Sequence, residues 1–264
     1  MLHRFIPDYP LQDDPKIQLE ITKRKEFRDM EAMRKEVRGR NGFFNHQNLV
    51  SRYIRNYDRV FLFHETGTGK SGTIVNTTEY FKKHPEEGIK RAVILEPGPA
   101  TIKNFEEQIL KHSEKGEYEN EKTERATKIQ TLKRNITAML RKFYLIEGYE
   151  TFTRQVRRLS DEDIRKEFSD NFFFLDEIHA AVRNLSDKPR KEDDKENKYE
   201  SLWRVLHIAE RVKIIVGTAT PLVNNSKDFV SMMNLILPAN KQLPFSWDYS
   251  KVTYKQLEPY LRGK

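Results

Sequence analysis

The stretch "FLFHETGTGKSGTIVN", residues 61–76, decides the fold. An apolar run leads into two glycines, Lys70 and Ser71, and residues compatible with a helix follow. Gly67 and Gly69 permit the positive or crowded backbone angles that a sharp turn requires. Strand, glycine turn and helix in this order are typical of a phosphate-binding loop, where the start of the helix attracts the anion.

The loop departs from the usual phosphate-binding pattern at its first position, where His64 replaces the expected glycine. Lys70 would reach the β- and γ-phosphates, and the Ser71 hydroxyl would hold Mg²⁺. A glycine turn before an ordinary helix start is the alternative interpretation. The predicted nucleotide-binding residues here are Thr66, Gly67, Thr68, Gly69, Lys70 and Ser71.

The composition limits the classes of protein that remain. The chain has 264 residues, 37% of them hydrophobic, which is enough for a packed core. It has no cysteine, which excludes disulfides and thiolate zinc sites and fits an intracellular protein. No apolar run approaches the length of a membrane span, and the first residues lack a signal-peptide core.

The net charge is +8, which favours polyanions as partners, nucleic acid first. The alternative is that the charges only form a solvated surface of mixed sign.

Short apolar runs alternate with helix-like stretches from residue 43 onward. The runs are continuous rather than alternating, as expected for parallel strands buried on both faces. The sequence therefore predicts an α/β fold, a doubly wound parallel sheet with helices on both faces. The predicted strands are 59–64, 91–97, 142–148, 171–177 and 212–218, and the predicted helices are 70–84, 99–113, 149–159, 199–210 and 226–237.

The same pattern suggests three regions. Residues 1–42 are expected to be an N-terminal arm with a charged helix over 16–38, residues 43–240 a nucleotide-binding domain, and residues 241–264 a linker. Two polar stretches, 114–135 and 183–198, are expected to be surface insertions.

An acidic pair, Asp176 and Glu177, ends the apolar strand of "FFFLDEIHAAV". Ligands of open α/β sheets bind at this carboxyl edge. Asp176 would hold the same Mg²⁺ as Ser71, and Glu177 would orient or deprotonate an attacking water. The alternative is a strand that ends in an acidic helix cap.

A further strand, "IIVGTATP" (214–221), ends in small and hydroxylated residues. Thr218 and Thr220 could bond Glu177 or His179 across neighbouring strand ends, so that they respond to the γ-phosphate. The alternative is that small residues simply make a tight exit from the strand.

Gln47 precedes the loop on a predicted amphipathic helix. A glutamine amide can pair with N6 and N7 of adenine, and Phe43 or Phe44 could stack on the ring. The alternative is an ordinary solvated glutamine.

The order of six blocks resembles the first motor domain of superfamily 2 helicases over roughly residues 43–240. The last block looks like the Swi2/Snf2 group of DNA translocases and its relatives in large DNA viruses. Among these, poxvirus-type early transcription factor ATPases and nucleoside triphosphate phosphohydrolases are similar. The blocks are "HQ", "HETGTGKS", "ILEPGPATIKNF", "YLIEGYETF", "FFFLDEIH" and "VGTATPLVNNSKDFVSMMNLILP".

The resemblance implies a RecA-like fold and assigns roles to matching positions. Gln47 would read adenine, Lys70 and Ser71 would bind phosphate and magnesium, and Asp176 and Glu177 would be the metal-holding and catalytic acids. The coupling positions would be His179, Thr218 and Thr220, and the nucleic-acid positions Pro97, Thr101, Lys103 and Gly148.

The resemblance also implies a DNA-dependent ATPase that uses ATP and Mg²⁺. Helicase-type motors bind ATP between two RecA-like domains, so a second such domain, in cis or in trans, would supply an arginine. The implied partners are nucleic acid, with double-stranded DNA favoured, and RNA polymerase or other transcription factors. No membrane association is implied. If the protein is viral, it would be found inside the cell, in the virion and in the host cytoplasm. The alternatives are a non-catalytic docking module of a transcription complex and the motor part of a restriction enzyme.

Overall fold

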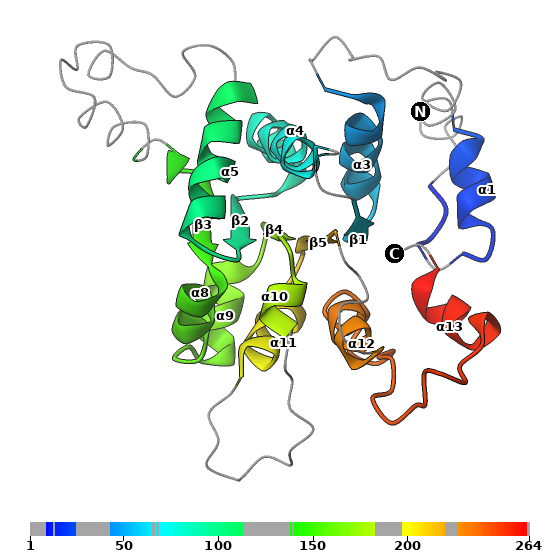
Figure 1. Cartoon of the computed structure of the whole chain (residues 1–264). Helices are drawn as coiled ribbons and strands as arrows, with labels where there is room; N and C mark the ends of the chain where they lie inside the picture. Colours follow the sequence, from blue (N-terminus) through cyan, green and yellow to red (C-terminus); the bar gives the residue numbers. More distant parts are fainter. Residues whose placement is uncertain are drawn as a thin grey trace, which may run out of the picture.

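A sheet of five parallel strands in the order β1-β5-β4-β2-β3 forms the centre of the protein (Figure 1). The computed structural model describes residues 9–12, 14–24, 43–64, 67, 69–112, 138, 140–182, 197–219 and 226–262. The strands are β1 (Arg59–Phe63), β2 (Arg91–Glu96), β3 (Tyr144–Gly148), β4 (Asn171–Leu175) and β5 (Lys213–Thr218). All five predicted strands are present, each within two residues of the predicted bounds.

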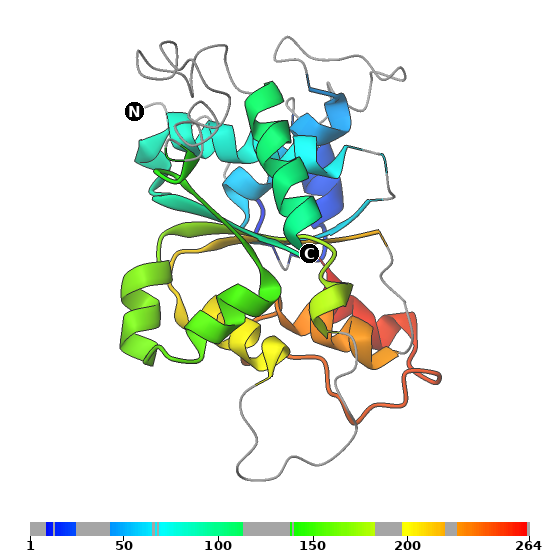
Figure 2. The same cartoon turned by 60° about the vertical axis from the view of Figure 1, so that its left-hand side comes forward.

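Helices cover both faces of this sheet (Figures 1 and 2). One layer contains α3 (Asn45–Asn56), α4 (Lys70–Lys83) and α5 (Pro99–His112); the short 3₁₀ turn η2 (Pro85–Glu87) follows α4. The opposite layer contains α8 (Tyr149–Val156), α9 (Asp161–Phe168), α10 (His179–Val182), α11 (Lys198–Ile208) and α12 (Ser226–Asn234). The predicted doubly wound α/β class is therefore confirmed.

The central strand β4 shows why the apolar runs are continuous. All five of its residues, "NFFFL", are buried. Phe172 and Phe174 belong to the core beneath α3, α4 and α5, whereas Phe173 belongs to the core on the opposite face. Successive side chains of a strand point to opposite faces, so both faces of β4 need apolar residues.

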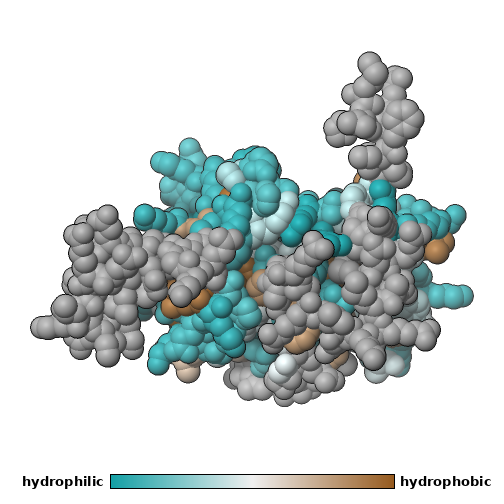
Figure 3. Space-filling view, turned by 90° about the horizontal axis from the view of Figure 1, so that it is seen from above, coloured by the Kyte–Doolittle hydropathy of each residue, from teal (hydrophilic) through white to brown (hydrophobic). Residues whose placement is uncertain are grey.

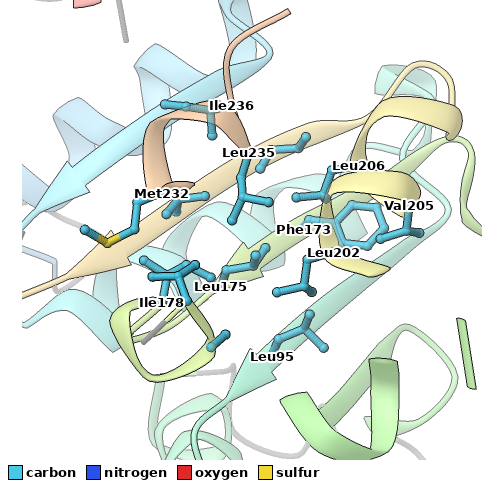
Figure 4. Close-up of a cluster of buried hydrophobic side chains, with 14 of the residues drawn as sticks. Leu95, Phe173, Leu175, Ile178, Leu202, Val205, Leu206, Met232, Leu235 and Ile236 are labelled. Carbon is cyan, nitrogen blue, oxygen red and sulfur yellow. The ribbon is translucent and has the colours of Figure 1, made fainter. Parts of the chain in front are cut away.

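The larger core lies between the sheet and helices α11 and α12 (Figure 4). Leu95 and Leu175 project from the strands, and Leu202 and Leu206 meet them from α11. Each of these four side chains is fully buried. This packing fixes the strand ends on which the candidate site depends.

Helix α9 was not predicted as a separate element, because the helix expected over 149–159 ends early at Val156. A local signal starts the new helix. The Ser160 hydroxyl accepts from the Asp163 amide, and the Asp163 carboxylate accepts from the Ser160 amide, which is a capping box. Ile164 and Phe168 then bury its apolar face.

The N-terminal arm packs on α3. Helix α1 (Ile17–Thr22) buries Ile17 and Ile21 against Tyr57, and the Gln12 side-chain amide donates to the Arg59 carbonyl at 2.6 Å. Because β1 is the edge strand, this contact covers part of an open sheet edge. The charged helix expected over 16–38 ends at Thr22 in the described part, and residues 25–42 lie outside it.

The segment after α12 packs against helices α11 and α12 where it begins. The side-chain amide of Asn234 makes two hydrogen bonds to the backbone of Leu243. Its Nδ2 donates to the Leu243 carbonyl at 3.0 Å, and its Oδ1 accepts from the Leu243 backbone amide at 2.7 Å. Gln242 accepts from the Trp203 indole at 3.1 Å. The chain then reaches α13 (Tyr254–Leu261), which has a proline inside it.

The described surface agrees with the charged composition. Figure 3 shows mostly hydrophilic residues with small hydrophobic patches on the face that it views. None of the helices that the structure describes has both the length and the hydrophobicity to cross a bilayer. The stretch 114–135, and all of 183–198 except its last two residues, lie outside the described residues.

Asp170, at the amino end of β4, permits a test of stability. It has a positive φ of 60°, and Arg211 and Lys90 bind its carboxylate at 2.6 and 2.7 Å. These bonds hold its pKa at about 2, below the ordinary 3.8. We expect Asp170→Asn, which tolerates this backbone, to lower the free energy of unfolding at pH 7 by about 1 kcal/mol after allowance for solvent screening.

The sign follows from the lowered pKa of Asp170. The stabilisation is present above pH 4 and is lost as the pH falls towards 2, so the difference between wild type and variant should close in that window. Urea unfolding at several pH values measures it. Asp58→Asn is the control, because its side chain is 73% exposed, and it should change stability by less than about 0.5 kcal/mol. An equal loss in both variants would count against the Asp170 contacts.

Candidate nucleotide-binding site

The topology places three strand ends side by side. Strand β5 lies between β1 and β4, so the loop after β1, the acidic pair after β4 and Thr218 at the end of β5 share one edge. The carboxyl edge of a parallel sheet is where ligands bind in this class of fold. The start of α4, the acidic pair and Thr218 therefore lie close together.

The two glycines of the loop have the backbone angles that the sequence predicts. Gly67 and Gly69 have φ values of 85° and 83°, which favour glycine. Gly69 is the N-cap of α4, and its carbonyl accepts from the Thr73 amide at 3.0 Å. Helix α4 therefore begins at Lys70, with Ser71 in its first turn.

Lys70 joins the loop to the acidic pair. Its Nζ lies 2.7 Å from Asp176 Oδ1 and 2.5 Å from Glu177 Oε1. All three side chains are largely buried, since Lys70 and Asp176 are each 12% exposed and Glu177 is 23% exposed. The ammonium group thus belongs to a largely buried polar centre.

The charges of this centre determine its pKa values. Burial alone would lower the pKa of Lys70, but the two carboxylates outweigh it and raise that pKa above its ordinary value. Burial raises the pKa of Asp176 despite the neighbouring ammonium. Burial would also raise the pKa of Glu177, but Lys70 and the Ala219 amide lower it below its ordinary range. Glu177 is therefore ionised at neutral pH and can accept a proton.

Glu177 is held in place from several sides. It has a φ of 44°, in the left-handed region that is uncommon for residues other than glycine. The Ala219 amide donates to Oε2 at 3.2 Å, and the Thr218 hydroxyl lies 3.5 Å from the same oxygen. His179 Nδ1 lies 3.3 Å from Oε2 and 3.1 Å from the Thr218 hydroxyl. His179 and Thr218 thus both contact Glu177.

Gly217 explains why small residues end β5. A Cβ at this position would lie 2.9 Å from the Phe174 ring and 3.3 Å from Lys70 Cδ. The glycine therefore leaves room for the aliphatic part of Lys70 to cross the strand on its way to the carboxylates.

Gln47 is not the solvated glutamine of the alternative interpretation, because it is only 5% exposed. Its Nε2 donates to the Gly69 carbonyl at 2.9 Å, and its Oε1 accepts from the Phe44 amide at 2.8 Å. A Cβ on Gly72 would lie 2.7 Å from the same Nε2. The amide keeps one N–H and one lone pair, which are the two groups that pairing with adenine needs.

His64 follows β1 directly, and its backbone amide donates to the Thr218 carbonyl at 3.3 Å. Its ring lies 5.8 Å from the His46 ring, which is stacked with Phe44 at 5.7 Å. Burial lowers the pKa of His64, and the charges of His46 and Lys70 lower it further. The residue that replaces the first glycine is therefore neutral and links the loop to the Gln47 region.

The predicted nucleic-acid positions lie beyond the acidic pair, at the ends of β2 and β3. Pro97 follows β2 and is exposed, and Thr101 lies in the first turn of α5, where its hydroxyl donates to the Gly98 carbonyl at 2.8 Å. Lys103 is 73% exposed. Gly148 ends β3 and is the N-cap of α8. Thr66, Thr68 and Thr220 lie outside the described residues.

Sequence reasoning missed three groups at this edge: Glu96, Tyr149 and the Ala219 amide. Glu96 ends β2 and is 1% exposed, and burial with the charge of Asp176 raises its pKa to about 8. The Tyr149 hydroxyl donates to the Asp176 carbonyl at 2.7 Å. The sequence did contain a signal for Glu96. Its carboxyl group follows the buried run "AVIL", just as that of Asp176 follows the buried run "NFFFL".

The donor set fits Mg²⁺ bound together with phosphate. No group of three or more histidines, cysteines or carboxylates gathers among the described residues as a metal site. Mg²⁺ sites at phosphates use only one or two carboxylates plus substrate oxygens and waters. A hydroxyl at Ser71 and a carboxylate at Asp176 meet that requirement.

The chain is similar to known proteins over most of its length. The family described as "Type III restriction enzyme, res subunit" matches residues 23–223. "Putative helicase 087L" of Invertebrate iridescent virus 3 is 27% identical over 89% of this chain and 24% of its own length. "Putative helicase 009L" of Frog virus 3 is 28% identical over 80% of this chain and 22% of its own length. The chain thus spans about a quarter of the length of these relatives.

Among solved structures, the Sulfolobus solfataricus SWI2/SNF2 ATPase core in complex with dsDNA is similar, with 15% identity and a TM-score of 0.48. The match covers 74% of this chain and 35% of that one. The family match covers most of the domain that contains Lys70 and the acidic pair. The chain therefore belongs to the family described as "Type III restriction enzyme, res subunit" and has the N-terminal motor domain of a superfamily 2 helicase.

Proposed function

We propose that the chain is the ATP-binding half of a nucleic-acid-dependent ATPase, a helicase or translocase. The observation that carries the proposal is the contact of Lys70 Nζ with both Asp176 and Glu177 at the sheet edge. The Lys70 ammonium lies between two carboxylates and beside a glycine loop. From there it can leave the carboxylates and bind phosphate oxygens.

In this proposal the loop amides, Lys70 and the start of α4 bind the phosphates of ATP. Ser71 and Asp176 would hold Mg²⁺, which when bound neutralises charge on the phosphate oxygens. Gln47 pairs with the adenine edge. Thr66, Gly67, Thr68 and Gly69 complete the loop.

Glu177 is the proposed base, because the Ala219 amide holds its Oε2 while its Oε1 faces Lys70, the group that would move to the phosphates. His179, Thr218 and Thr220 would report the state of the γ-phosphate through Glu177. Efficient hydrolysis would need an arginine from a second RecA-like domain, in cis or in trans, a contribution worth about 10³–10⁵ in rate in related phosphate chemistry. Residues 241–264 would lead towards that domain.

The proposed polymer is nucleic acid, with double-stranded DNA favoured, and its contacts are Pro97, Thr101, Lys103 and Gly148. The net charge of +8 supports a polyanion. A role in viral transcription, with RNA polymerase or transcription factors as partners, is the specific form suggested by the motif resemblance. A protein of this kind would act inside the cell and, if viral, in the virion and host cytoplasm.

Direct binding tests the proposal. A fluorescent ATP analogue titrated into the chain with Mg²⁺ should bind weakly and saturably, and ATP should be turned over very slowly. Substantial DNA-stimulated turnover by these residues alone would contradict the need for a second domain. No saturable binding would contradict the nucleotide site itself.

A restriction-enzyme motor is the second candidate, favoured by the description of the matching family. It requires a nuclease that acts with the motor. Cleavage of unmodified DNA by the assembled protein, but not of methylated DNA, would favour it over a helicase of transcription.

Gln47→Ala should reduce the preference for ATP over GTP. The amide holds Gly69 and also provides the adenine-pairing groups, so we expect ATP affinity to fall about tenfold, equivalent to about 1.4 kcal/mol. GTP affinity should fall by less, which displacement titrations with both nucleotides will show. An equal loss for ATP and GTP would mean that Gln47 only supports the loop.

Binding to duplex DNA should depend strongly on salt and little on sequence. Lys103→Ala should reduce the slope of log affinity against log salt by about 0.9, the value for one lost phosphate contact. Lys90→Ala is the matched control, since both side chains are 73% exposed and Lys90 lies at the opposite sheet edge. Equal slopes for Lys103→Ala and wild type would exclude a phosphate contact at Lys103.

A further inference from the structure

Glu96 is a buried carboxyl group without a role in the proposed function. It is the last residue of β2, and its neighbour Leu95 pairs with Leu175 in the sheet register. The Asp176 amide donates to the Leu95 carbonyl at 2.9 Å. Glu96 and Asp176 therefore leave the sheet side by side, and Glu96 itself pairs with Gly148 on the other side.

Polar groups of the nucleotide site and of α5 face this side chain. The charges of Asp176, Lys70 and Glu177 act on it from the nucleotide site, and Thr101 of α5 lies on its other side. Its Oε1 is buried and has no hydrogen-bond partner within the described part of the chain. An unsatisfied buried polar atom is costly, so a rearrangement that supplies a partner is favoured.

The Thr101 side of the cluster belongs to an exposed turn. The Thr101 hydroxyl donates to the Gly98 carbonyl at 2.8 Å and accepts from the Gly98 amide at 3.3 Å, while Pro97 is exposed. The Asp176 side belongs to the site where Lys70 would leave the carboxylates for phosphate. Glu96 is thus the side chain between the nucleotide site and the turn assigned to nucleic acid.

We propose that Glu96 is a positioning residue that links the Asp176 end of the nucleotide site to the Pro97–Thr101 turn. When Lys70 moves to the phosphates, Glu96 no longer faces the lysine charge on that side. The Glu96 carboxyl group then forms hydrogen bonds with the turn and holds the turn in one conformation. By reciprocity, a polymer that orders the turn favours the nucleotide-bound arrangement. This inference rests on the proposed nucleotide site and adds the path by which that site communicates with nucleic acid.

Hydrogen exchange of the peptide covering residues 96–103, with and without saturating Mg·ADP, tests the link. In the wild type we expect at least threefold slower exchange when the nucleotide is bound. Glu96→Gln, which keeps the shape and both hydrogen-bonding functions, should retain this response within twofold. Glu96→Leu and Thr101→Val should lose it.

Glu106→Leu is the matched control, the same substitution on α5 but outside the cluster, and it should respond as the wild type does. If Glu96→Leu does not fold, Thr101→Val decides the result. A wild-type response in Glu96→Leu and Thr101→Val would overturn the proposal, and so would wild-type exchange over residues 96–103 that does not change when Mg·ADP binds. A Mg·ADP binding isotherm on the same samples distinguishes failure of the proposed nucleotide site from failure of the proposed role of Glu96. Absence of binding would contradict the nucleotide site itself.

Discussion

Replacing Lys70 by Met should abolish measurable Mg·ATP binding at concentrations that saturate the wild type. The ammonium lies at the start of α4, between Asp176 and Glu177. Without it, the triphosphate loses a charge-assisted contact worth about 3 kcal/mol, or about 100-fold in affinity. The triphosphate would also face the negative charge of Glu177 without the ammonium beside it. The measurement is a titration with a fluorescent ATP analogue.

The same substitution should destabilise the protein without ligand, because it leaves two largely buried carboxylates unpaired. The double variant Lys70→Met with Glu177→Gln removes one of those charges. It should therefore recover part of the lost stability but none of the binding. Lys82→Met, at the other end of α4, is the control and should bind like the wild type. Normal binding by a folded Lys70→Met protein would contradict the account.

Glu177→Gln should separate binding from hydrolysis. The amide has nearly the same shape, so Kd for Mg·ATP should stay within about fivefold. The single-turnover rate should fall by about 10²–10⁴, the usual contribution of a positioned general base. The structure gives the reason: the Ala219 amide holds Oε2 of Glu177, and Oε1 contacts the ammonium that would move to the phosphates of ATP.

The rate must be measured with protein in excess over radiolabelled ATP, because turnover by this half alone is expected to be very slow. Glu210→Gln, on an exposed side chain, controls for the loss of one negative charge. Unchanged turnover in Glu177→Gln would assign proton abstraction to another group. Lost binding would mean that Glu177 mainly positions the loop.

The sequence predicts local structure well where two signals agree. Gly67 and Gly69 need positive φ, and the apolar run before them needs burial; together they placed β1 and α4 within one residue. The run over β4 was recognised for the same reason, because a strand buried on both faces has no alternation. Helix α9 was missed because its capping box lies within a charged stretch without a strong apolar pattern.

The arrangement of the site needed the structure. The order of strands in a sheet is not encoded in any single segment, so only the topology shows that β5 separates β1 from β4. Contacts made by backbone groups, such as that of the Ala219 amide with Glu177, leave no mark in residue types. The burial of Gln47 and Glu96 likewise depends on elements distant in sequence.

A crystal structure of the chain with Mg²⁺ and a non-hydrolysable ATP analogue tests the central claim most directly. The account predicts that Lys70 Nζ moves from Asp176 to the β- and γ-phosphates. It also predicts the metal between Ser71 and Asp176, with oxygen distances of about 2.1 Å to its inner-sphere ligands. A triphosphate bound at another edge of the sheet, with Lys70 still paired to Asp176 and Glu177, would contradict it.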